Sequence, residues 1–308
     1  MLLKQYKTHF FDSLKNNQDE QEIESLFFIL TEYLHNLKRV DVALNPNFEI
    51  SEEEVEKWNT ILSELQQEKP IQYITGEAWF YGLQFEVNEN TLIPRPETEE
   101  LVEWIIQSQK SKVQSQKLEI LDIGTGTGCI PISLKANLPH ANVSAIDVSE
   151  QALEVAKRNA ASNKVEISFI QTNILEVEVL SQLPSSITHH PSSYNIIVSN
   201  PPYVRNLEKQ EIKKNVLDYE PHLALFVEDT DALLFYRKIA QLALKNLSQN
   251  GLLFFEINQY LGKETVELLE NIGFKNIELK KDIYGNDRMI KCMNRKKGQI
   301  DTTFSIQN

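Results

Sequence analysis

The sequence predicts an α/β protein in which a small helical domain precedes an open, mainly parallel sheet. Over residues 1–75 apolar side chains recur at helical spacing, whereas from Glu119 onward short apolar runs alternate with helical segments. Such alternation is typical of a parallel sheet covered by helices. A glycine-rich segment ends the first apolar run and opens a predicted helix, which is the arrangement found in nucleotide-binding α/β folds.

Residues 1–75 are predicted to form three or four amphipathic helices. Apolar residues repeat every three or four positions over residues 3–14, 23–37 and 55–65. The third stretch follows Ser51-Glu52-Glu53-Glu54, where the side chains of Ser51 and Glu54 can bond each other's free backbone N–H groups as a capping box. The region holds 14 acidic and 7 basic residues, which we interpret as a solvated helix surface.

A β-hairpin is predicted over residues 76–92, between the helical domain and a second domain over residues 93–293. The aromatic stretch 79–81, then Gly82, then the alternating stretch 85–87 has the pattern of two short strands around a tight turn.

Five strands are predicted in the second domain from their short apolar runs, namely residues 120–121, 143–146, 167–170, 194–199 and 252–255. The polar stretches 107–117 and 181–193 are expected to be flexible, and residues 294–308 are expected to form a disordered tail.

The composition excludes several classes of protein. A net charge of −13 over 308 residues repels phosphate backbones, so direct nucleic-acid binding is not expected. The two cysteines are far apart in sequence and suggest neither a disulfide scaffold nor a zinc site, and no metal is expected. No apolar run approaches the roughly 20 residues that a membrane span needs, so we expect a cytoplasmic protein.

The glycine-rich segment predicts a cofactor site. It reads Asp122-Ile123-Gly124-Thr125-Gly126-Thr127-Gly128. Glycines let the backbone turn sharply and let a ligand approach where a Cβ atom would intrude. The spacing is Gly-x-Gly-x-Gly and not the dinucleotide pattern, and Asp122 can approach the amino-acid end of a cofactor. Both features favour S-adenosylmethionine over a nicotinamide cofactor.

Two further strand ends are expected to contact the same cofactor. Asp147 closes the second strand nineteen residues after Gly128, where a carboxylate can accept hydrogen bonds from two ribose hydroxyls. Asn173 and Ile174 follow the third strand, where an amide and an apolar side chain can contact the adenine ring. Asp147 could instead cap the helix that follows, but its pairing with the glycine loop favours the ribose role.

The reacting site is predicted at Asn200-Pro201-Pro202-Tyr203, directly after the fourth strand. An amide or aromatic amine nitrogen is a poor nucleophile because its lone pair is delocalised. The Asn200 side-chain oxygen and the Pro201 carbonyl can each accept one N–H of such a group, and the two prolines fix the backbone. Tyr203 is expected to provide a flat packing wall. The residues therefore predict methyl transfer to a planar NH2 group, with Asn200 also adjoining the cofactor.

These motifs resemble the bacterial N5-glutamine methyltransferases of peptide-chain release factors, the HemK/PrmC family. The resemblance covers roughly residues 70–292 and more loosely the helical N-terminus. Besides the glycine loop and residues 200–203, it rests on the segments Pro70-Ile71-Gln72-Tyr73-Ile74-Thr75-Gly76, Ile93-Pro94-Arg95-Pro96-Glu97-Thr98-Glu99, Tyr219-Glu220-Pro221 and Asp282-Ile283-Tyr284-Gly285-Asn286-Asp287-Arg288.

The resemblance implies a Rossmann-like class I methyltransferase sheet with S-adenosyl-L-methionine as cofactor. It implies that Gly124 to Gly128 and Asp147 contact the cofactor, with Arg95, Glu97 and Thr98 near its methionine end. Asn200 to Tyr203 would contact the substrate amide. The implied substrate is the glutamine of the Gly-Gly-Gln motif in class I release factors, and the helical domain would help to hold the release factor.

Three alternatives remain at this point. An adenine-N6 DNA methyltransferase could use the same four residues on a flipped base, but the acidic charge and the lack of a basic target-recognition segment oppose it. An N5-glutamine methyltransferase of a ribosomal protein would share the catalytic motif. A catalytically silent binding protein would not be expected to keep the glycine loop, Asp147 and Asn200.

Overall fold

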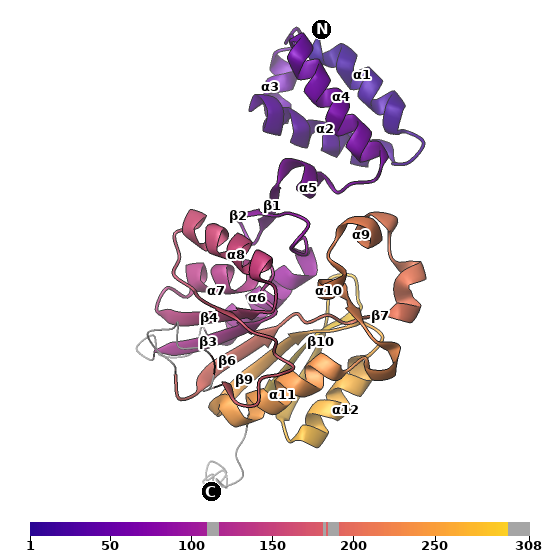
Figure 1. The fold of residues 1–308 in the computed structure, drawn as a ribbon. Helices are drawn as coiled ribbons and strands as arrows, with labels where there is room; N and C mark the ends of the chain where they lie inside the picture. The colour runs from indigo at the N-terminus through magenta and orange to yellow at the C-terminus, as the bar shows by residue number, and fades with distance from the viewer. Residues whose placement is uncertain (110–116, 181–182, 184–190, 295–308) are drawn as a thin grey trace, which may run out of the picture.

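The computed structural model describes residues 1–109, 117–180, 183 and 191–294. A helical bundle at the N-terminus is joined through a hairpin to a sheet flanked by helices (Figure 1). Most of the two stretches expected to be flexible, and residues 295–308 of the expected tail, lie outside the described residues. Asn294, the first residue of that expected tail, is buried, and its side-chain amide donates to the carbonyl oxygens of Leu244 and Leu247.

The N-terminal region contains five helices, which agree with the helical periodicity of its sequence. They are α1 (Leu3–Leu14), α2 (Glu20–His35), α3 (Arg39–Leu44), α4 (Glu52–Gln66) and α5 (Ile71–Thr75). The apolar faces of α1, α2 and α4 meet around Trp58, whose ring lies within 6 Å of the Phe10 and Phe27 rings. These helices have a hydrophobic core of their own, separate from that of the sheet.

The capping box at the start of α4 is confirmed. The Glu54 backbone N–H donates to the Ser51 hydroxyl oxygen at 3.2 Å, and the Ser51 N–H donates to the Glu54 carboxylate at 2.7 Å. This exchange satisfies two of the N–H groups that a helix start leaves without partners.

The predicted hairpin is also confirmed, with β1 (Glu77–Phe80) pairing antiparallel to β2 (Leu83–Glu86). Tyr81 and Gly82 form its turn with φ angles of +51° and +75°. Two successive positive φ angles match the right-handed twist of the strands. The hairpin packs against the second domain, because the Asn159 side chain on α8 bonds both the N–H and the carbonyl of Glu86.

In the described part of the chain the main sheet has seven strands, in the order β10-β11-β9-β6-β3-β4-β5. They are β3 (Leu118–Ile123), β4 (Ala141–Asp147), β5 (Ser168–Gln171), β6 (Tyr194–Ser199), β9 (Leu247–Glu256), β10 (Lys275–Lys281) and β11 (Asp287–Met293). The first five coincide with the predicted runs, except that β5 begins one residue after the run 167–170, and they pair in parallel. The last two, which the apolar pattern did not reveal, pair antiparallel at one edge.

Helices cover both faces of this sheet (Figure 1). They are α6 (Pro96–Gln109), α7 (Cys129–Asn137), α8 (Glu150–Ser162), α11 (Leu234–Asn246) and α12 (Gly262–Ile272). Successive residues of β6 point to opposite faces, so Ile196 packs on the side of α6 and α7, and Ile197 on the side of α11 and α12. The α/β class and the mainly parallel sheet are therefore confirmed.

A long excursion between β6 and α11 reaches back toward the helical bundle. It contains β7 (Val204–Arg205), η2 (Asn206–Glu211), α9 (Lys214–Tyr219), α10 (His222–Leu225), β8 (Phe226–Val227) and η3 (Asp229–Asp231). At the end of α9 the Tyr219 hydroxyl donates to the carbonyl oxygen of Gln67 at 3.0 Å. Among the described residues, no helix is long and apolar enough to span a bilayer.

Candidate active site

A cavity of about 350 Å³ lies where β3, β4, β5 and β6 end. This is the edge at which open parallel sheets bind ligands. Ten of the predicted site residues line it: Gly124, Thr125, Gly126, Thr127, Asp147, Asn173, Ile174, Asn200, Pro201 and Pro202. Asp122, Gly128 and Tyr203 lie outside its lining. Residues brought from four strand ends thus share one cavity with Arg95 and Thr98 of the Ile93–Glu99 segment.

The glycine loop is fixed to the end of β4. The N–H groups of Gly124 and Thr125 both donate to the Ile146 carbonyl oxygen, at 2.8 and 3.0 Å. Gly126 has a φ of +53°, and no protein atom lies within 4 Å of the place where a Cβ atom would stand. Since Gly126 lines the cavity, that open space is available to a ligand.

Gly128 serves packing instead. A Cβ atom there would lie 2.9 Å from the Ile132 side chain and 3.2 Å from that of Ala156 on α8. Gly128 also precedes α7 with a φ of +80°. The third glycine therefore allows helices α7 and α8 to approach the loop, and the structure gives it no place at the cavity wall.

Asp147 connects the loop to the next helix. Its two carboxylate oxygens accept from the Gly126 N–H at 2.8 Å and from the Ser149 N–H at 2.9 Å. The N-cap of α8 is Ser149, whose hydroxyl accepts from the Ala152 N–H, so Asp147 does not act as the cap. Burial raises the pKa of the Asp147 carboxyl, against the effect of these N–H donors.

Asp122 is a buried acid behind the loop. It is fully buried in β3, and among the described residues neither of its oxygens has a partner at hydrogen-bond geometry. Burial raises the pKa of the carboxyl to about 7, the nearby Thr125 hydroxyl and Ile123 N–H lower it in part, and Asp147 adds to the rise. An acid held in this way without a partner is unusual outside functional sites.

Asn173 and Ile174 both reach the cavity after β5, but the Asn173 amide is engaged locally. Its oxygen accepts from the Leu175 N–H at 3.1 Å and its NH2 group donates to Glu176 at 2.9 Å. Ile174 is 7% exposed and packs into the sheet core.

Asn200 follows β6 with its amide held in a definite orientation. Its NH2 group donates to the Thr98 hydroxyl oxygen at 3.4 Å. Among the described residues, no group donates to the Asn200 side-chain oxygen or to the Pro201 carbonyl oxygen. Two acceptors therefore remain open beside the cavity, as binding of a planar NH2 group requires.

Tyr203 has a different role from the flat wall expected of it. Its ring packs against the sheet core, and its hydroxyl donates to the Glu256 carboxylate at 3.2 Å. Burial raises the pKa of the Tyr203 hydroxyl, and the neighbouring Glu256 adds to this. The proline pair turns the chain so that Tyr203 lies behind the site.

Sequence reasoning missed the polar groups that support the site. The Glu256 carboxylate also accepts from the Thr98 hydroxyl, and the Asn258 amide donates to the Tyr203 carbonyl oxygen. Arg95 donates to the buried Glu220, which also accepts from the Ile93 N–H at 3.2 Å. For Glu256 the available signal was an acid directly after the apolar run 252–255, at the edge that carries the other site residues.

The fold and site define a class I methyltransferase. A parallel α/β sheet carries a glycine loop after β3, an acid at the end of β4 and Asn-Pro-Pro-Tyr after β6. The family model described as "Methyltransferase small domain" matches residues 105–222. The hMettl16 catalytic domain aligns with a TM-score of 0.52 at 17% identity, over 71% of this chain and 78% of that one, which supports the fold alone.

More similar relatives define the family within this class. The release factor glutamine methyltransferase of Flavobacterium psychrophilum is 62% identical over 291 residues, which are 94% of this chain and 99% of the relative. That of Bacteroides thetaiotaomicron is 39% identical, over 90% and 95% of the two chains. The model described as "PrmC N-terminal domain" matches residues 7–76. The chain belongs to the release factor glutamine methyltransferase family.

The buried carboxyl of Asp122 predicts a pH-dependent loss of stability in the cofactor-free protein. Its pKa is raised from 3.8 to about 7 in the folded state, so folding is favoured below pH 4 and progressively less as pH rises to 7. Asp122→Asn removes this contribution. Between pH 4.5 and 8 the free energy of unfolding of the variant should rise by about 3 kcal/mol relative to that of the wild type.

Urea unfolding of both proteins at these two pH values measures the difference. If the difference between the two free energies of unfolding does not change with pH, the Asp122 carboxyl is ionised in the folded protein over this whole range and its pKa is not raised.

Proposed function

We propose that this protein transfers a methyl group from S-adenosylmethionine to the side-chain amide nitrogen of the glutamine in the Gly-Gly-Gln motif of class I release factors. The observation that carries the proposal is the Asn200 amide. Its NH2 group is turned to Thr98, which leaves its oxygen free at the edge of a cavity shared with the glycine loop.

The charge around the loop supports S-adenosylmethionine as the cofactor. Asp122 and Asp147 are two acids close enough for the charge of one to raise the pKa of the other, and they lie under and beside the glycine loop. Such a site attracts a sulfonium and ammonium cation and repels the pyrophosphate of a dinucleotide. The free space at Gly126 also fits this group. When bound, the cofactor supplies an electrophilic methyl group.

The chain's own residues provide positioning and hydrogen-bond acceptors. The Asn200 oxygen and the Pro201 carbonyl can each accept one N–H of a substrate amide, which holds both protons in place and favours pyramidalisation of the nitrogen. The fixed φ angles of Pro201 and Pro202 hold the backbone that carries these acceptors in one conformation. Orientation and preorganised dipoles then account for most of the rate gain, and no general base is needed to abstract a proton before attack.

The choice of a release factor as substrate rests on the relatives. Release factor glutamine methyltransferases match this chain over almost its whole length, and the N-terminal match favours this branch over an enzyme acting on a ribosomal protein. The net charge of −13 argues against an adenine-N6 DNA methyltransferase. A release-factor substrate also implies a cytoplasmic location.

We assign the helical residues 1–75 to docking of the release factor. They have their own hydrophobic core, so they can present a surface without disturbing the sheet. The contact between Tyr219 and Gln67 links this domain to the excursion that also supplies Pro221 and Leu223 to the cavity wall. Residues 76–92 would form the linker, with the methyltransferase domain over 93–293.

Replacing Asn200 by alanine removes one of the two acceptors. Asn200→Ala should fold and bind S-adenosylmethionine as the wild type does, while kcat falls about 10²–10³-fold, by analogy with the loss of an oxyanion-hole donor. Transfer of labelled methyl groups to a purified release factor measures the effect. Asn195→Ala, at the opposite end of β6, is the matched control and should keep its activity. Unchanged turnover in Asn200→Ala would refute the acceptor mechanism.

Placing a branched side chain at Gly126 should block the cofactor. The added atoms would enter the open space at the cavity, and we expect the affinity for S-adenosylmethionine to fall at least about tenfold. Gly82→Val is the control, because Gly82 also has a positive φ and open surroundings but lies in the hairpin turn. Calorimetric titration that gives wild-type affinity for Gly126→Val would contradict the cofactor site.

A further inference from the structure

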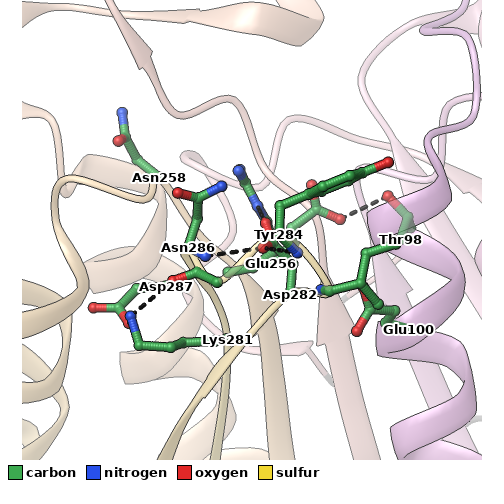
Figure 2. Close-up of polar contacts among 12 residues, drawn as sticks. Thr98, Glu100, Glu256, Asn258, Lys281, Asp282, Tyr284, Asn286 and Asp287 are labelled. Carbon is green, nitrogen blue, oxygen red and sulfur yellow. Dashed lines mark hydrogen bonds and ion pairs between the residues drawn. The ribbon is translucent and has the colours of Figure 1, made fainter.

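A buried acid with no assigned role lies behind the reacting site. Glu256 ends β9, which pairs in parallel with β6, the strand that leads to Asn200. The residue is 1% exposed. Its carboxylate accepts from the Thr98 hydroxyl at 2.6 Å and from the Tyr203 hydroxyl at 3.2 Å. Figure 2 shows Thr98 on α6 pointing toward this carboxylate.

When the Glu256 carboxyl is ionised, the hydrogen bonds of Thr98 have only one consistent direction. An ionised carboxylate can only accept, so the single hydroxyl proton of Thr98 is committed to Glu256. The Thr98 oxygen then has only lone pairs to offer, and it can accept from Asn200 but cannot donate to it. The Asn200 amide must therefore turn its NH2 group toward Thr98, which is the contact observed at 3.4 Å.

This orientation matters because the two ends of an asparagine amide have nearly the same shape. Packing alone does not distinguish them, and hydrogen bonds decide which end faces a given neighbour. With the NH2 group directed to Thr98, the Asn200 oxygen is left for the substrate. The reversed amide would present donors to the donors of the substrate NH2 group. At 3.4 Å the contact is longer than most N–H···O hydrogen bonds.

We propose that Glu256 is a positioning residue that fixes the Asn200 amide through the Thr98 hydroxyl, so that the Asn200 oxygen faces the reacting nitrogen. The proposal rests on the amide methyl transfer proposed above and adds the device that orients its acceptor. Glu256 does not line the cavity, and both of its oxygens are occupied by hydroxyl groups. It is therefore placed to hold Thr98 and not to remove a proton from the substrate.

The surroundings of Glu256 raise the pKa of its carboxyl above the ordinary value, and three neighbours offset part of the cost of the ionised form that this arrangement needs. Burial raises the pKa of the carboxyl, whereas the Thr98 hydroxyl, the Arg288 guanidinium and the Tyr203 hydroxyl all lower it. Arg288 on β11 is held in turn by Asp282 at 3.1 Å, and Glu97 on α6 is the neighbouring acid. On α11 the Tyr236 hydroxyl donates to the Glu256 backbone carbonyl at 3.3 Å.

Two substitutions test the series of hydrogen bonds from Glu256 through Thr98 to Asn200, which we call the relay. One changes the acid and the other the hydroxyl group. In Glu256→Gln the new NH2 group can donate to Thr98, which frees the Thr98 proton for Asn200 and permits the reversed amide. Thr98→Val removes the hydroxyl and keeps the shape. For both variants we expect kcat on a release factor to fall at least tenfold, with KM for the release factor within threefold of wild type. Because Glu256 lies outside the cavity lining, Glu256→Gln should also leave the Kd for S-adenosylmethionine unchanged.

Conservative variants separate positioning from packing. Thr98→Ser retains the hydroxyl and should restore most of kcat, which a purely structural role of the methyl group would not do. Thr265→Val removes an equally buried threonine hydroxyl whose bond is to the Leu261 carbonyl within α12, and it should behave as wild type. Values of kcat within threefold of wild type in both Glu256→Gln and Thr98→Val, or a Thr98→Ser variant as slow as Thr98→Val, would overturn the proposal. If Glu256→Gln does not fold, the comparison of Thr98→Val with Thr98→Ser tests the proposal by itself.

A second readout needs no substrate. In the full-length ¹⁵N-labelled protein, the side-chain NH2 signals of Asn200 can be assigned by their absence from Asn200→Ala. They should shift in Thr98→Val and Glu256→Gln and stay in place in Thr265→Val. Unshifted signals would overturn the relay. If the wild type methylates no release factor but these shifts occur, the proposed function fails and the orientation of Asn200 by Glu256 stands.

Discussion

The parallel pairing of β3 with β4 on one side and β6 on the other is the constraint on which the site depends. It places three strand ends side by side, although they lie far apart in the sequence. The glycine loop, Asp147 and Asn200 then border one cavity because each follows directly from its strand. The loop is held to the neighbouring strand by the Ile146 carbonyl and the Asp147 carboxylate, so its shape depends on that pairing.

The polar groups behind this edge divide into two sets with different tasks. Asp122 and Asp147 form an acidic set near the glycine loop. Burial raises the pKa of both carboxyl groups, so a cation bound nearby would offset the cost of ionising them. Glu256 belongs to the second set. Its carboxylate accepts from the hydroxyl groups of Thr98 and Tyr203, and the Thr98 oxygen in turn accepts from the Asn200 amide. The first set suits a positively charged cofactor. The second fixes the direction of a neutral acceptor, which is what an amide nitrogen requires.

Much of this could be predicted from the sequence, because the signals were local. Five parallel strands, the hairpin turn at Gly82 and the capping box at Ser51 follow from periodicity and from residue preferences over a few positions. The antiparallel β10 lacks an apolar run because most of its side chains are exposed, and in β11 Lys291 interrupts the apolar residues. The packing role of Gly128 and the bond from Tyr203 to Glu256 depend on α8 and β9, whose positions only the tertiary fold sets. The release factor itself was inferred from family resemblance, since residues 200–203 demand only a planar NH2 group.

The most direct test of the account is to locate the transferred methyl group. The wild-type protein is incubated with a purified class I release factor and S-adenosylmethionine carrying an isotopically labelled methyl group, and the product is digested and mapped by fragmentation mass spectrometry. The account predicts one label, on the side-chain amide nitrogen of the glutamine in the Gly-Gly-Gln motif. A label on any other residue, or transfer to DNA with none to the release factor, would contradict it.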